Sequence, residues 1–186
     1  VDGIAGLEVN VSCPNVESEG MAFGVDPKVV EQVTKAVRKV TDKPVIVKLS
    51  PNVTDIVEIA KAVEAGGGNG VSLINTLLGM AIDIHRRKPL LGNTYGGLSG
   101  PAVKPVALRM VHQVYKGVTI PIIGLGGIMS GTDAIEFMMA GAQAVQVGTA
   151  TMVDPTAISR IAREMGEYVE THNLNSITDI VGAVHQ

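Results

Sequence analysis

The sequence alternates between short apolar runs and longer stretches whose apolar residues recur at helical spacing, and this alternation constrains the fold more than any other feature. The order of helix, glycine stop and buried strand at residues 64–73 occurs again at residues 139–147. We therefore expect strands and helices that alternate, with parallel strand pairing. The expected strands are residues 7–11, 44–50, 70–76, 120–124 and 144–149. The expected helices begin at Asp26, Thr54, Pro101, Thr132 and Asp154, and a capping box at Ser176 and Asp179 predicts a final one.

Two architectures fit this alternation, an open doubly wound sheet and a (β/α)₈ barrel. The barrel is favoured because polar residues that can carry chemistry follow every expected strand, whereas a doubly wound sheet gathers them at one switch point. A closed barrel needs eight strands, and the chain supplies about five and begins with Val1 rather than Met. We therefore expect residues 1–186 to be a single domain, the C-terminal portion of a (β/α)₈ barrel whose first strands belong to a longer protein.

The composition excludes several classes of function. A formal net charge of −3 leaves no electrostatic footprint for nucleic acid. No apolar run approaches the roughly 18 residues that span a bilayer. A single cysteine excludes an internal disulfide framework and a cysteine-rich metal site, and it favours a cytoplasmic location. The histidines have no ligand spacing, so we expect no metal; they are His85, His112, His172 and His185.

The single cysteine, Cys13, lies in the loop that follows the first expected strand. An isolated cysteine is most often a small buried apolar residue. Here Asn10, Ser12 and Asn15 surround the thiol with more hydrogen-bonding groups than an apolar core needs. A thiol at the end of a parallel strand, where a glycine-containing loop begins, is therefore a candidate catalytic base.

Polar residues also end the second and third expected strands. Lys48 lies in the apolar run 44–50, and an unpaired buried ammonium is costly. It needs either a ligand with delocalised negative charge or a salt bridge to an acidic residue beyond this chain. Asn75 and Thr76 end the next strand, where such residues are more often turn formers. Together with Asn10, these amides could bind a planar substrate that contains ring amides.

Glycines follow the last two expected strands, at Gly126-Gly127 and at Gly148-Thr149. In a barrel these two loops form the usual phosphate site, because glycine lets backbone N–H groups approach phosphate oxygens. The alternative is that the glycines only permit tight turns. Two such loops at the last two strands favour phosphate binding.

Residues 77–100 interrupt the alternation. Short apolar runs flank the basic turn at residues 85–88, which predicts a small hairpin with a solvated tip. Long insertions of this kind are usually functional or mobile.

Six motifs follow one another along the chain, at residues 10–15, 47–52, 74–76, 96–101, 124–127 and 147–149. They read NVSCPN, VKLSPN, INT, GGLSGP, GLGG and VGT. Each motif is weak alone, but the ordered set is specific and extends over essentially the whole chain. It resembles class 1 dihydroorotate dehydrogenase, and most closely the class 1B, NAD-linked catalytic subunit. The stretch 79–101 favours class 1B over the fumarate-linked class 1A, which is the near alternative.

The resemblance implies that Cys13 is the base that removes a proton from C5 of dihydroorotate while C6 delivers hydride to N5 of FMN. Lys48 would face the pyrimidine end of the flavin, and residues 14–24 would form a lid. The orotate ring would be held by Asn10, Asn75, Thr76 and Asn15, and Asn10 would also contact the flavin. The remaining flavin contacts would come from Ile74 and Gly100, with the phosphate on Gly126, Gly127, Gly148 and Thr149.

The resemblance also implies a pathway and partners. The reaction would be the oxidation of dihydroorotate to orotate in de novo pyrimidine (UMP) biosynthesis. Class 1B members pass electrons to NAD⁺ through a second subunit that carries FAD and a [2Fe–2S] cluster, and we expect a homodimer of catalytic subunits as well. Two other readings are a flavin-free isomerase or lyase that binds phosphate, and an inactive fragment.

Overall fold

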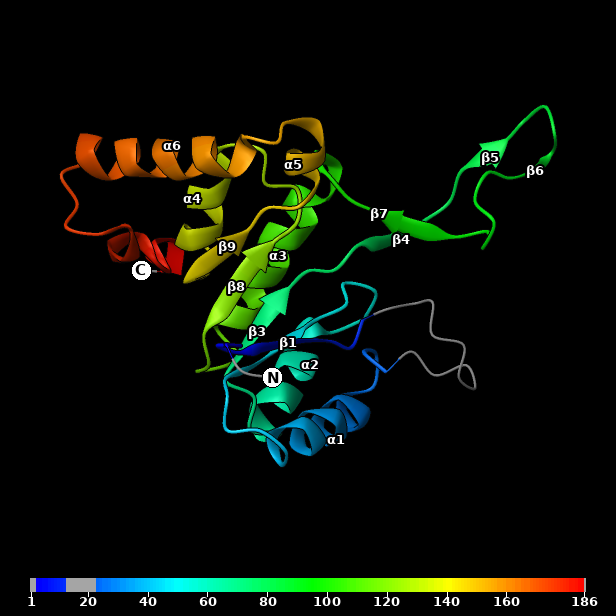
Figure 1. The fold of residues 1–186 in the computed structure, drawn as a ribbon, viewed down its shortest axis with the longest axis horizontal. Helices are drawn as coiled ribbons and strands as arrows, with labels where there is room; N and C mark the ends of the chain where they lie inside the picture. Colours follow the sequence, from blue (N-terminus) through cyan, green and yellow to red (C-terminus); the bar gives the residue numbers. More distant parts are fainter. Residues whose placement is uncertain (1–2, 13–22, 186) are drawn as a thin grey trace.

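The computed structural model describes residues 3–12 and 23–185. Its central sheet consists of five parallel strands, β1 (Leu7–Asn10), β2 (Val45–Lys48), β3 (Gly70–Leu73), β8 (Ile122–Leu125) and β9 (Ala144–Gln146). They pair in the order β1-β2-β3-β8-β9 (Figure 1). Within this sheet, the strands lie side by side in the same order as in the chain, without the reversal of order that defines a doubly wound sheet. The predicted order of a (β/α)₈ barrel is therefore confirmed for these strands.

Helices connect successive strands and follow the last one. They are α1 (Pro27–Arg38), α2 (Ile56–Ala65), α3 (Lys104–Tyr115), α4 (Gly131–Met139), α5 (Thr149–Val153) and α6 (Ala157–Thr171). Short 3₁₀ turns occupy Pro101–Val103, Ile177–Ile180 and Ala183–His185, so the predicted final helix is a 3₁₀ turn. Within the described ranges, none of the helices has the length and apolar character needed to cross a membrane.

The sheet has one apolar face and one mixed face. Val45 and Val47 of β2 and Val71 and Leu73 of β3 are fully buried against the helices. Their neighbours along each strand point to the opposite face, because successive side chains of a strand alternate. The register of the strands places Glu8, Lys48, Ser72, Leu125 and Gln146 on this mixed face.

A carboxylate bridges distant strands across the mixed face. Glu8 Oε1 on β1 accepts hydrogen bonds from Ser72 Oγ on β3 (2.5 Å) and from Gln146 Nε2 on β9 (3.1 Å). β1 and β9 are the two outermost strands of the described sheet. A direct contact between them requires the sheet to curve toward this face, which is therefore the inner face of the barrel.

The helix starts differ in detail from those predicted. Asp26 caps α1 as expected. The cap of α2 is Asp55 rather than Thr54, and the cap of α4 is Ser130. Asp133 takes the third position of α4 and completes a capping box, so the predicted start at Thr132 lies two residues after the actual cap, Ser130. α6 begins at Ala157, after the predicted Asp154.

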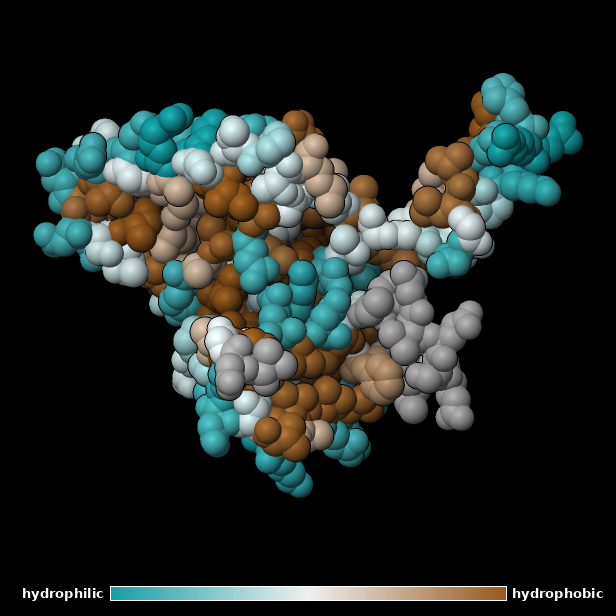
Figure 2. Space-filling view, viewed as in Figure 1, coloured by the Kyte–Doolittle hydropathy of each residue, from teal (hydrophilic) through white to brown (hydrophobic). Residues whose placement is uncertain are grey.

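The insertion forms an arm, which we define as residues 77–98. Its outer part is the predicted hairpin, β5 (Ile82–Asp83) paired with β6 (Lys88–Pro89). Its base is a second antiparallel pair, β4 (Leu77–Gly79) with β7 (Gly96–Leu98), which the sequence did not predict because three-residue strands with glycine carry little strand signal. The arm projects from the barrel (Figure 1), and apolar side chains lie exposed along it (Figure 2).

Candidate functional site

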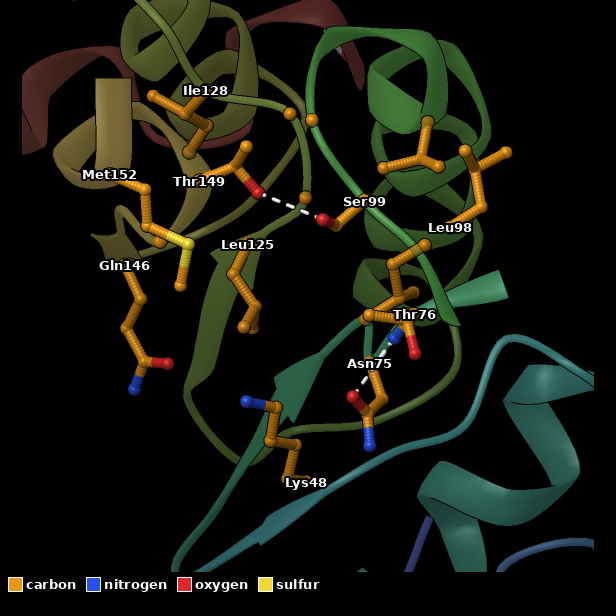
Figure 3. A pocket seen from close by; sticks show the side chains of 16 residues that line it. Lys48, Asn75, Thr76, Leu98, Ser99, Leu125, Ile128, Gln146, Thr149 and Met152 are labelled. Carbon is orange, nitrogen blue, oxygen red and sulfur yellow. Dashed lines mark hydrogen bonds between the residues drawn. The ribbon is translucent and has the colours of Figure 1, made fainter. Parts of the chain in front are cut away.

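A cavity of about 240 Å³ opens at the carboxyl ends of the strands (Figure 3). Its walls come from the ends of β2, β3, β8 and β9 and from residues 98–103, which precede α3. Barrel enzymes bind their ligands at this end, because the βα loops converge there.

Nine of the predicted site residues line this cavity, namely Lys48, Ile74, Asn75, Thr76, Gly100, Gly126, Gly127, Gly148 and Thr149. Asn10 does not line the cavity, but its side chain accepts a hydrogen bond from Asn75, which does. Cys13 and Asn15 lie outside the described residues, as does the expected lid apart from residues 23 and 24. The structure thus brings together residues that are separated by as many as 101 positions in the chain.

Side-chain amides and a hydroxyl form a cluster where β1 and β3 end. Asn10 Oδ1 accepts hydrogen bonds from Ser12 N (3.1 Å), from Ser12 Oγ (2.6 Å) and from Asn75 Nδ2 (3.3 Å). Asn75 Oδ1 accepts one from the Thr76 N–H at 2.9 Å. Among the described residues, the Asn10 Nδ2 group donates to none of these partners, so it remains available to a ligand carbonyl.

Lys48 ends β2 on the inner face and is partly buried. Its side chain extends toward the cavity between those of Asn75 and Gln146 (Figure 3). The ion pairs and side-chain hydrogen bonds within residues 3–12 and 23–185 do not include Lys48. The nearest candidate on its own face, Glu8, already accepts hydrogen bonds from Ser72 and Gln146. An ammonium placed in this way can stabilise negative charge on a ligand in the cavity.

The two glycine loops differ in why they need glycine. Gly127 has a φ of +79°, and a Cβ there would lie 2.6 Å from the Gly100 carbonyl oxygen, so the fold itself requires glycine. At Gly148, a Cβ would have no atom within 4 Å. The turn explanation therefore accounts for Gly127, whereas Gly148 leaves room beside the cavity that a ligand could fill.

We expect Gly127→Ala and Gly148→Ala to separate these two roles. Gly127→Ala should lower the Tm by several degrees, since a side chain at positive φ costs about 1–3 kcal/mol and the clash adds to it. Gly148→Ala should leave the Tm unchanged but weaken flavin phosphate binding. Thermal unfolding without ligand and titration with FMN measure both effects. A Gly148→Ala variant with unchanged FMN affinity would remove Gly148 from the phosphate site.

Seven further residues line the cavity without having been predicted as site residues, namely Leu98, Ser99, Val103, Leu125, Ile128, Gln146 and Met152. Ser99 Oγ accepts a hydrogen bond from Thr149 Oγ1 at 3.0 Å, which joins the segment before α3 to the loop after β9 (Figure 3). The sequence could have indicated Gln146 as a site residue, because it is a polar residue at an inward position of an apolar strand. No pattern in the sequence indicated Met152, because the short helix α5 was not predicted.

Two of the histidines meet in the described part of the chain, where the rings of His112 and His185 stack with their centroids 4.1 Å apart. His85 is exposed in the arm, and His172 stacks on Tyr168 with ring centroids 3.9 Å apart. Within the described ranges, the histidines and the acidic residues form no group of three or more that could hold a metal ion.

Comparisons with known proteins identify the family. The family model described as dihydroorotate dehydrogenase matches residues 4–169. The catalytic subunit of dihydroorotate dehydrogenase B (NAD(+)) from Desulforamulus reducens is 64% identical over 184 residues, which are 99% of this chain and 60% of that protein. The subunit of the same name from Geobacter sp. (strain M21) is 60% identical over 182 residues, covering 98% of this chain and 60% of its own length.

A solved structure shows the same fold. The crystal structure of DHODH from Eimeria tenella in complex with ferulenol superposes with a TM-score of 0.80 at 24% sequence identity. The match covers 98% of this chain and 54% of that one. The fold is thus part of a (β/α)₈ barrel, and the chain spans about 60% of the length of the curated relatives that it matches. From the family match and these relatives we conclude that the chain belongs to the dihydroorotate dehydrogenase family.

Proposed function

We propose that this chain contributes the active site for oxidation of dihydroorotate to orotate, a step of de novo pyrimidine (UMP) biosynthesis. The observation that carries the proposal is the convergence of nine predicted ligand residues on one cavity at the carboxyl ends of the strands. The names of the relatives, which specify a catalytic subunit and NAD(+), support the class 1B assignment over the fumarate-linked class 1A.

The cavity residues fit FMN. The backbone at Gly126, Gly127 and Gly148 leaves N–H groups uncovered by side chains, as a phosphate requires. The Thr149 hydroxyl lies at the start of α5, on the same wall. Ile74 supplies an apolar surface for the flat ring, beside Gly100. When bound, FMN supplies a hydride acceptor, N5, that amino-acid side chains do not offer.

Two side chains would carry the charge movements of the reaction. Cys13, as thiolate, would accept the proton from C5 of dihydroorotate, and the hydride from C6 would leave to the flavin, so that a C5–C6 double bond forms. Lys48 would stabilise the negative charge that arrives at the pyrimidine end of the flavin. The Cys13 thiol would end the half-reaction protonated, and solvent would then take the proton.

The amide cluster would hold the substrate ring. Orotate presents ring N–H groups and carbonyls in one plane, and the amides of Asn10 and Asn75 offer the matching acceptors and donors. Thr76 would add a hydroxyl, and Asn15 a further amide. Because Asn10 also fixes Ser12, the same residue would orient the chain that leads into Cys13.

We further propose a partner subunit with FAD and a [2Fe–2S] cluster and a homodimer of catalytic subunits, acting in the cytoplasm. The exposed apolar side chains of the arm support a role in subunit contacts, since Ile84 is 75% exposed and Leu90 is 64% exposed. Isolated exposed apolar residues are common, but those of the arm lie along one projecting element (Figure 2).

The test is a flavin spectrum. The protein as its gene encodes it should copurify with one FMN and show the visible absorbance band of oxidised flavin. Dihydroorotate added without oxygen should bleach this band at a rate that saturates with concentration. A colourless protein that takes up no FMN, or a flavin that dihydroorotate does not reduce, would refute the proposal.

A further inference from the structure

We infer that Asp133 is a positioning residue for the flavin phosphate. It fixes the backbone of the loop at residues 126–131 and ties this loop to the adjacent start of α3. The inference rests on the proposed function, because it concerns the same FMN site. Asp133 itself does not line the cavity and acts through the loop.

The first part of the argument is the set of hydrogen bonds that Asp133 accepts. Its Oδ2 accepts from the backbone N–H groups of Met129 (2.8 Å) and Ser130 (3.0 Å). Its Oδ1 accepts from Lys104 Nζ at 2.7 Å. The side chain is only 15% exposed, so these bonds form where water competes weakly. Asp133 thus holds the loop directly after the glycine pair that we assign to phosphate binding.

The second part is the place of Lys104. A Cβ on Gly127 would lie 2.8 Å from the Lys104 backbone nitrogen and 2.6 Å from the Gly100 carbonyl oxygen. The loop and the start of α3 are therefore in direct backbone contact. The Lys104–Asp133 ion pair holds the two segments together, and both Gly100 and Gly127 line the cavity.

Lys104 cannot itself serve as a free cation for phosphate. Its ammonium lies 2.7 Å from Glu136 Oε2 as well as 2.7 Å from Asp133 Oδ1, so two carboxylates offset one positive charge. Hydrogen bonds to Asp133 and Glu136 raise the pKa of Lys104. Burial would raise the pKa of Asp133, but the hydrogen bonds from Lys104 and the loop lower it overall. The pair stays ionised at neutral pH, and its role is to set positions.

The far side of the loop is held in the same manner. Arg160 Nη2 donates to the Met129 carbonyl oxygen at 3.1 Å, and the Glu164 carboxylate accepts from the Gly131 N–H. Arg160 also pairs with Asp154 (3.5 Å), which directly follows α5. One network of charges therefore joins the loop at residues 126–131 to the start of α3 and to the C-terminal end of α5, the helix that begins at Thr149.

A simpler role for Asp133 is to cap α4, which it does together with Ser130. This role predicts a loss of stability and no preference between ligands. The chain contains a matched control, because Asp179 forms the same capping box with Ser176 in the 3₁₀ turn Ile177–Ile180. Asp179 does not contact the loop at residues 126–131, so its replacement tests capping alone.

The experiment compares FMN with riboflavin, which lacks the phosphate. Flavin fluorescence titrations of the apoprotein, as its gene encodes it, give both dissociation constants for the unaltered protein and for Asp133→Asn. We expect the variant to bind FMN about tenfold more weakly, which corresponds to the loss of one charged hydrogen bond. Its dissociation constant for riboflavin should stay within about twofold of that of the unaltered protein. Asp179→Asn should lower the Tm and leave the ratio of the two dissociation constants unchanged. Glu136→Gln, which keeps the bonds from Asp133 to the loop, should change that ratio by less than about threefold.

Several outcomes would overturn the inference. Equal weakening of FMN and riboflavin by Asp133→Asn would show a general loss of structure. An Asp179→Asn variant with the same change in ratio would show that capping alone explains the effect. If Asp133→Asn does not fold, Lys104→Met should still weaken FMN binding and spare riboflavin, and an unchanged ratio there would refute the inference. Failure of the unaltered protein to prefer FMN over riboflavin would instead refute the phosphate site of the proposed function.

Discussion

A Lys48→Met variant should reduce its bound flavin with dihydroorotate about 10²–10³-fold more slowly than the unaltered protein, the effect typical of removing one preorganised charge from a transition state. Methionine keeps the length and apolar stem of the side chain, so the packing on β2 changes little. Hydride transfer places negative charge on the flavin, and Lys48 is the cation of the described residues that lines the cavity. Its loss should therefore slow the chemical step far more than it weakens FMN binding.

Anaerobic stopped-flow reduction separates these effects, because it gives the limiting rate apart from the dissociation constant of dihydroorotate. The flavin midpoint potential should become more negative in Lys48→Met, since the charge that favours the reduced form is gone. Lys61→Met is the matched control, because Lys61 is an exposed lysine of α2 that pairs with Glu58 at 3.1 Å. If Lys48→Met reduced its flavin slowly but kept an unaltered flavin midpoint potential, Lys48 would act on the substrate rather than on the flavin.

The order of strands was predictable because parallel strands that are buried on one face carry a simple signal. The expected strands at residues 44–50 and 70–76 are mainly apolar runs that end in polar residues, and each follows a helical pattern. The rule that parallel strands end at the same edge then placed Lys48, Asn75 and the glycine loops together without coordinates. Geometry of this kind depends only on topology.

The parts that were missed depend on details that a pattern does not contain. Three-residue strands in the arm and the five-residue helix α5 are too short for periodicity to show. The bridge from Glu8 to Gln146 joins residues 138 positions apart, and it depends on the curvature of the sheet. The network around Asp133 was equally hidden, because Asp133 was read as a helix start. Its partner Lys104 and Arg160, which binds the same loop, lie on other helices.

A Cys13→Ser variant should slow flavin reduction by about 10²–10⁴-fold, the range for loss of a general base. The described residues that precede Cys13 in the chain are held beside the cavity. Ser12 is held by Asn10 through both its backbone N–H and its hydroxyl, and Asn10 in turn contacts Asn75 on the cavity wall. A serine hydroxyl keeps the size of the thiol but remains protonated at neutral pH, so it cannot accept the C5 proton in the same way.

The pH dependence makes this prediction specific to a thiol. An ordinary cysteine has a pKa of about 8.5, so only a small fraction is thiolate at pH 7. The limiting rate of flavin reduction by the unaltered protein should therefore rise from pH 6 to 9, and Cys13→Ser should lack this rise. FMN affinity is the control and should be the same in both, because no predicted flavin contact is altered. Reduction at an unchanged rate in Cys13→Ser, or a flat profile in the unaltered protein, would assign the proton to another group. The proposed mechanism would then fail even if the cavity binds FMN as described.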